Sequence, residues 1–185
     1  MNEARTEENA ILALLESTAS ESSGAAVASI YDEAVDRLVT LWVHNRNNEQ
    51  EWPSDFVDAV RELLKSDANR HGFQAYVGKC ESLALRSMQD GFRRSCYYRS
   101  HIQVVIEEFV PFAALVHPAD VESLADIDEI YVDDANQIPP IPPQDIPSWV
   151  PESHWWWRAP TRLDMSQQEI DEKLNDYHPE DWETP

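Results

Sequence analysis

A chain of 185 residues, 42% of them hydrophobic, is long and apolar enough to fold as one domain around its own core. Its 14 basic and 35 acidic residues give a net charge of −21, which disfavours nucleic acids and anionic membranes as partners and favours basic proteins. Glycine occurs only four times, which argues against a phosphate-binding loop and against a turn-rich all-β barrel.

The start of the sequence and its cysteines indicate a cytoplasmic protein. The segment MNEARTEEN is acidic and polar where a signal peptide is basic and then apolar, and no apolar run approaches the length of a membrane span. We therefore expect no contact with a membrane. Cys80 and Cys96 are expected to be buried free thiols, because structural disulfides are rare in the cytoplasm.

Apolar residues recur at intervals of three and four along the first half of the chain, which predicts amphipathic helices. These predicted helices cover residues 6–17, 27–44, 53–66 and 73–94. The segment DANRHG is expected to end the third of them, with Gly72 as a left-handed cap residue. Four amphipathic helices joined by moderately long loops predict a helical bundle.

The segment 101–116, HIQVVIEEFVPFAALV, fits either a fifth helix or a buried strand. Its β-branched residues favour the strand, but no partner strand is evident, so we prefer a helix. Pro111 would then kink that helix, because its ring clashes with the preceding turn. A short helix is expected at 117–127, and a brief extended segment at 129–134.

Residues 137–161 hold seven of the twelve prolines and four of the seven tryptophans. This proline density excludes a helix or a central strand, because the amide donors are missing. The large apolar side chains in the segment argue against a solvated linker, so an ordered arm is expected. Ser166 and Glu169 have the spacing of a capping box and predict a short final helix to about residue 177.

These elements predict a mainly α fold. Residues 1–135 are expected to form a single-domain bundle of about five helices. Residues 136–185 are expected to form a Pro/Trp-rich, acidic, irregular arm with a short final helix, packed on the bundle within the same structural domain.

Catalytic and metal-binding motifs are missing from the sequence. It has no CxxC, HxxxH or HExxH pattern for zinc, and no GxSxG, Walker or GxGxxG pattern. The carboxylates at 126–134 lack the glycine of a calcium-binding loop. We expect no cofactor and no metal, and favour a protein that is not an enzyme. If there is a catalytic site, His154 beside the tryptophans is its candidate centre.

Charge is distributed unevenly along the chain. Residues 1–99 hold 16 acidic and 11 basic side chains, a net −5, and residues 100–185 hold 19 and three, a net −16. Arg86, Arg93, Arg94 and Arg99 are expected to pair with carboxylates of this acidic half, because the forked guanidinium suits a carboxylate.

Tryptophans within a strongly acidic segment predict a partner-binding surface, because carboxylates steer a basic partner and tryptophan is enriched at binding hot spots. The predicted contact residues are Asp126, Asp128, Glu129, Asp133, Asp134, Trp149, Trp155, Trp156 and Trp157.

We therefore expect a non-enzymatic acidic interaction protein that binds and neutralises a basic protein such as a toxin or nuclease. Bacterial immunity proteins and antitoxin-like inhibitors are of this class. The alternatives are a DNA mimic that blocks a nucleic-acid-binding protein, an enzyme with a site near His154, and a structural component of a phage or scaffold.

Overall fold

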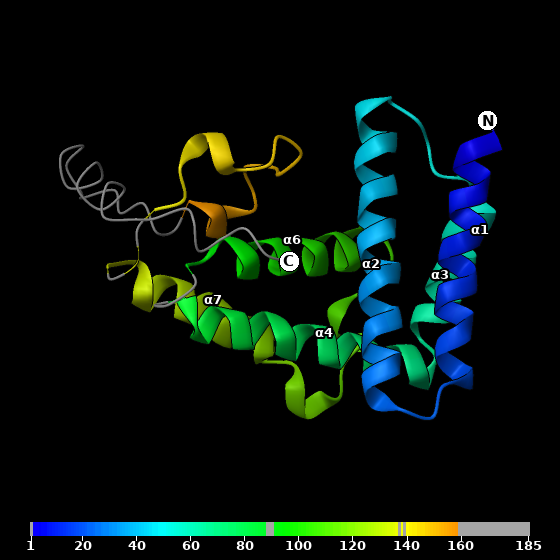
Figure 1. The fold of residues 1–185 in the computed structure, drawn as a ribbon, viewed down its shortest axis with the longest axis horizontal. Helices are drawn as coiled ribbons and strands as arrows, with labels where there is room; N and C mark the ends of the chain where they lie inside the picture. The colour runs from blue at the N-terminus through cyan, green and yellow to red at the C-terminus, as the bar shows by residue number, and fades with distance from the viewer. Residues whose placement is uncertain (1, 88–90, 137, 139, 159–185) are drawn as a thin grey trace. The chain divides into compact units, whose positions relative to one another are not determined.

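The computed structural model describes residues 2–87, 91–136, 138 and 140–158, and this part of the chain contains helices but no strand. The α-helices are α1 (Asn2–Ser17), α2 (Gly24–Asn47), α3 (Ser54–Leu64), α4 (Asp67–Leu85), α6 (Arg93–Glu108) and α7 (Ser123–Asp133) (Figure 1). The mainly α fold class is confirmed. The predicted final helix at 166–177 lies outside the described residues.

The chain divides into two compact units, which we call unit 1 and unit 2. Unit 1 comprises Met1–Gly78 and His101–Val121, and unit 2 comprises Lys79–Ser100 and Glu122–Pro185. Helices α4 and α6 therefore contribute residues to both units. This division cuts across the segments predicted as bundle and arm, and that domain assignment stays a prediction.

In unit 1, α1 packs against α2 and α3, and α1 and α2 run in opposite directions (Figure 1). The ring of Tyr31 on α2 is fully buried and meets Phe73 and Tyr76 edge to face, each with ring centroids 6.3 Å apart. Gly72 lies inside α4 and does not end a helix as predicted. A Cβ atom at this position would lie 2.7 Å from the Tyr31 ring, so glycine permits this close packing.

The predicted exit of the third helix is the first turn of α4, which starts two residues after α3 ends. Its first turn is capped by Ser66, whose Oγ accepts the Asn69 amide at 3.4 Å. The buried Asn69 side chain donates to the carbonyls of Leu15 and Leu63 at 2.9 and 3.0 Å. It thereby satisfies carbonyls at the C-terminal ends of α1 and α3, which explains why α4 begins here.

The ambiguous segment 101–116 forms no strand: it is α-helical to Glu108, as preferred, but its second half is not, and Pro111 therefore does not kink the helix. Helix α6 ends at Glu108, and the amides of Phe109 and Val110 both donate to the carbonyl of Val105 at 3.1 Å. The chain leaves the helix before the proline because a residue that precedes proline is disfavoured in the helical conformation.

In unit 2, the predicted extended segment 129–134 is wrong, because residues 129–133 are helical in α7. The helix buries Ile127 and Tyr131, one turn apart, and Tyr131 meets Phe92 with ring centroids 5.1 Å apart. The described part of the arm, 138 and 140–158, is irregular, with 3₁₀ turns at Pro143–Asp145 and Trp155–Trp157. None of the helices in the described ranges combines the length and apolarity needed to cross a membrane.

Candidate functional site

The outer face of α7 is acidic and exposed. With Ile127 and Tyr131 turned inward, the helical period leaves one exposed stripe on the opposite side. We call this stripe the acidic face; it consists of Glu122, Ala125, Asp126, Glu129, Val132 and Asp133. Val132 is 60% exposed, so the face combines carboxylates with an uncovered apolar side chain.

The carboxylates of this face are not neutralised by ion pairs in the part of the chain that the structure describes. Among the described residues, no ion pair includes Glu122, Asp126, Glu129 or Asp133. Residues 122–158 contain eight acidic and one basic residue, so the sequence around the face adds negative charge. Asp134, just after α7, is half-buried. The face is therefore a source of negative potential that attracts cations from a distance.

Asp128 differs from its acidic neighbours because it is paired inside unit 2. Arg99 on α6 donates to its two carboxylate oxygens at 2.9 and 3.1 Å. The Arg99 side chain is only 6% exposed, and its guanidinium lies 4.2 Å from the centroid of the Trp156 ring. The predicted pairing of the arginines with the acidic half is seen in this contact. Asp128 thus fixes α7 against α6, and 27% of its side chain remains exposed.

The four predicted tryptophans divide into two buried and two accessible ones. Trp156 and Trp157 are 2% and 1% exposed, so they belong to the interior of unit 2. Trp155 is 38% exposed, and the half-buried Trp149 meets the edge of Tyr97 at 6.3 Å. Successive side chains in a 3₁₀ turn point about 120° apart, so Trp155–Trp157 cannot all face inward.

The hydroxyl of Ser100 decides which of the tryptophans are buried. Its Oγ accepts the indole N–H groups of Trp156 at 3.0 Å and Trp157 at 2.8 Å. The Trp156 indole N–H also lies 3.2 Å from the Cys96 carbonyl oxygen. Nδ1 of His154 lies 3.0 Å from the same Ser100 hydroxyl, which is therefore shared by three side chains of the arm.

This serine–histidine pair positions the arm and is not arranged for nucleophilic catalysis. Ser100 and His154 are 0% and 1% exposed, so a substrate cannot reach either atom in this conformation. The lone pairs that a nucleophile would use are already occupied by two indole donors. The His154 ring also stacks on Trp156, with centroids 4.7 Å apart.

The two cysteines are buried free thiols, as expected. Burial raises the pKa of the Cys80 thiol to about 12 and that of the Cys96 thiol well above its ordinary range. Both stay protonated at neutral pH and are poor nucleophiles and metal ligands. No group of three or more histidine, cysteine or carboxylate side chains within the described ranges is placed to hold a metal ion.

Sequence reasoning missed Ser100, and it expected Arg99 to pair within the acidic half without identifying Asp128 as the partner. Neither has a local signal, because their partners lie 29 to 57 residues away in the sequence. The acidic face did have a local sequence signal, because residues 122, 126, 129 and 133 follow the helical period. We did not recognise this signal because we assigned 129–134 to an extended segment.

Comparisons with protein-family models, with curated proteins and with solved structures found no match.

Proposed function

We propose that this protein binds a basic protein through the acidic face of α7, with Trp155 and Trp149 as aromatic anchors, and blocks that protein's activity. It would act as an immunity-protein or antitoxin-like inhibitor of a toxin or nuclease. The observation that carries this proposal is the row of exposed carboxylates without internal ion pairs among the described residues.

The chemistry of the surface supports such a role. Unpaired surface carboxylates accelerate encounter with a positively charged partner and disfavour acidic ones. Exposed indole rings bury a large area when a partner covers them, and tryptophan is among the residues most enriched at hot spots. Because Trp156 and Trp157 are buried and Asp128 is paired with Arg99, we assign the contact to the other residues of the predicted set: Asp126, Glu129, Asp133, Asp134, Trp149 and Trp155.

The test compares two charge-matched double variants as baits in affinity capture from native lysate. Glu129→Lys/Asp133→Lys reverses two carboxylates of the acidic face. Glu16→Lys/Glu21→Lys, the control, reverses two exposed carboxylates of unit 1. Proteins that bind at the acidic face should be basic, should be captured by the wild type and by the control, and should be lost with the α7 variant.

Rates of association and dissociation distinguish the role of the tryptophan from that of the carboxylates. Trp155→Ala should weaken binding of a captured partner about tenfold or more, mainly by faster dissociation, because a buried indole contributes about 2 kcal/mol at a hot spot. The α7 reversal should mainly slow association. Equal capture by all three baits, or retention of acidic proteins only, would disprove the proposal.

A DNA mimic is the second candidate, because the carboxylates of α7 form a regular row. Residues 122, 126, 129 and 133 are four, three and four residues apart, which places them about 4.5 to 6 Å apart along the axis of a helix. Successive phosphates of one DNA strand are separated by about 3.4 Å along the axis of the double helix. A DNA mimic predicts that duplex DNA displaces the captured partner, whereas an inhibitor bound away from a nucleic-acid site leaves DNA binding intact.

A further inference from the structure

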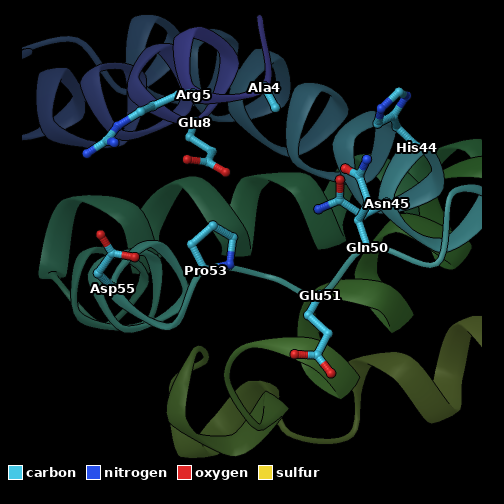
Figure 2. Close-up of a pocket in the computed structure, with 9 residues that line it drawn as sticks. All are labelled: Ala4, Arg5, Glu8, His44, Asn45, Gln50, Glu51, Pro53 and Asp55. Atoms are coloured by element: carbon cyan, nitrogen blue, oxygen red, sulfur yellow. The ribbon is translucent and has the colours of Figure 1, made fainter. Parts of the chain in front are cut away.

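A pocket of about 630 Å³ lies in unit 1, and none of its lining residues belongs to the acidic face (Figure 2). It is formed where the first turns of α1, the end of α2, the following loop and the start of α3 come together. Its lining residues are Ala4, Arg5, Glu8, His44, Asn45, Gln50, Glu51, Pro53 and Asp55. Its volume is that of a small-molecule site.

Asn45 gives the pocket a buried polar group that nothing in the described structure satisfies. The residue is 5% exposed, yet its side chain lines the pocket. Its backbone carbonyl accepts the Gln50 amide at 2.9 Å, but no hydrogen bond to its side-chain amide is found among the described residues. The two amide atoms are reached by solvent through the pocket, so they are free to form hydrogen bonds with a molecule held there.

The charged side chains of the lining set are mostly negative. Glu8, Glu51 and Asp55 face a single positive side chain, Arg5, so the charged lining has a net −2. Burial raises the pKa of Glu8, the nearby Asp55 raises it further, and Arg5 opposes both. In Figure 2, Glu8 lies between Asp55 on one side and the Asn45 and Gln50 amides on the other. Two repelling carboxylates beside amide oxygens would be stabilised by a donor-rich cation.

We infer that this pocket is a binding site for a small organic cation with an ammonium or guanidinium head. The head would donate hydrogen bonds to the carboxylates of Glu8 and Asp55 and to the amide oxygens of Asn45 and Gln50. A metal ion fits less well, since the described residues contain no group of three histidine, cysteine or carboxylate ligands in place. The inference does not depend on the proposed function, because it concerns other residues in the other unit.

The test uses ethylguanidinium chloride as the probe and N-ethylurea, which has nearly the same shape without charge, as its control. Each is titrated into the isotopically labelled full chain at constant ionic strength, and amide shifts are followed by NMR. Ethylguanidinium should give saturable shifts of the Asn45 and Gln50 side-chain amides, and N-ethylurea should give none. Butylammonium chloride, tested in the same way, distinguishes the two cation classes.

Two conservative variants locate the binding. Glu8→Gln should weaken ethylguanidinium about tenfold, since one charge-assisted hydrogen bond is lost. Glu16→Gln, an exposed glutamate on the same helix outside the pocket, should leave the affinity unchanged. The inference is overturned if N-ethylurea shifts the same amides equally, if the two variants bind alike, or if the shifts do not saturate.

Discussion

Two buried hydroxyl groups, one in each unit, show how differently the units are held together. The hydroxyl of Tyr31 in unit 1 has no hydrogen-bond partner in the described part of the chain, and the ring is held by aromatic neighbours. The hydroxyl of Ser100 in unit 2 has three partners, two indole N–H groups and one imidazole nitrogen.

The contrast arises because unit 1 consists mainly of regular helices, whereas unit 2 includes the irregular arm. Unit 1 packs regular helices, whose apolar stripes bury large rings, and burial of one such ring stabilises by about 2–3 kcal/mol, enough to offset one unsatisfied hydroxyl. Unit 2 has to fix an irregular, proline-rich arm without backbone ladders. The hydrogen bonds of Ser100 and the contact of the Arg99 guanidinium with the Trp156 ring fix the position of the arm. Stability in unit 2 is therefore concentrated in few atoms.

The largest effect is expected from Ser100→Ala. The substitution leaves the buried Trp157 indole N–H and the His154 nitrogen without their shared partner, whereas the Trp156 indole keeps the Cys96 carbonyl at 3.2 Å. It should lower the free energy of unfolding of unit 2 by about 2–4 kcal/mol. Urea denaturation followed by tryptophan fluorescence measures it. Ser95→Ala is the control, because the equally buried Ser95 bonds the Phe92 carbonyl and the Tyr131 hydroxyl, neither of which is in the arm, and its loss should cost about 1–2 kcal/mol. Equal losses would contradict the role of Ser100.

An intermediate effect, about 2 kcal/mol between pH 6.5 and about pH 5, is expected from the protonation of a buried histidine in unit 1. Burial lowers the pKa of His101 from 6.5 to about 3, and its Nδ1 lies 3.0 Å from the Tyr76 hydroxyl. The folded state thus keeps the ring neutral where the unfolded chain binds a proton. The contribution of the neutral His101 ring to the free energy of unfolding is complete above pH 6.5. It is lost at about 1.4 kcal/mol per pH unit as the pH falls from 6.5 towards about 3. His101→Gln should remove this part of the dependence of the free energy of unfolding on pH. Parallel pH profiles for the variant and the wild type would refute this role of His101.

The smallest effect, and the only gain, is expected from Tyr31→Phe. Removing a hydroxyl that is buried without a partner should raise the free energy of unfolding of unit 1 by about 1 kcal/mol. Tyr76→Phe is the matched control, because its hydroxyl bonds His101 and its loss should cost about 1 kcal/mol. Thermal and urea denaturation of both variants measure the difference, and a destabilised Tyr31→Phe protein would show that this hydroxyl is satisfied.

The helices could be predicted from sequence where their apolar stripes are long. The stripe from Val27 to Trp42 predicted α2 to within three residues at each end, because burial of one face dominates a long helix. The start of α4 was missed because Asn69 looks like a loop residue until the carbonyls of Leu15 and Leu63 are brought to it. The role of a polar residue that caps another helix becomes visible only when the tertiary structure brings the two helices together.

The candidate site was predictable in composition but not in orientation. The sequence indicated acidic residues and tryptophans around 126–157, and it indicated that three consecutive tryptophans cannot face one way. Which carboxylate turns inward depends on Arg99, and which indoles turn inward depends on Ser100. Both lie in a preceding helix, so no local pattern around α7 or the arm could reveal the choice.

Both cysteines of the chain lie in unit 2, which provides a way to follow that unit alone in the native protein. A thiol reagent reacts with an exposed thiolate, so Cys80 and Cys96 are modified only when unit 2 opens. The rate of modification therefore measures how often the arm and its helices separate, without denaturant and without an added label. Ser100→Ala should accelerate it, and a substitution confined to unit 1 that leaves it unchanged would mean that the two units open independently.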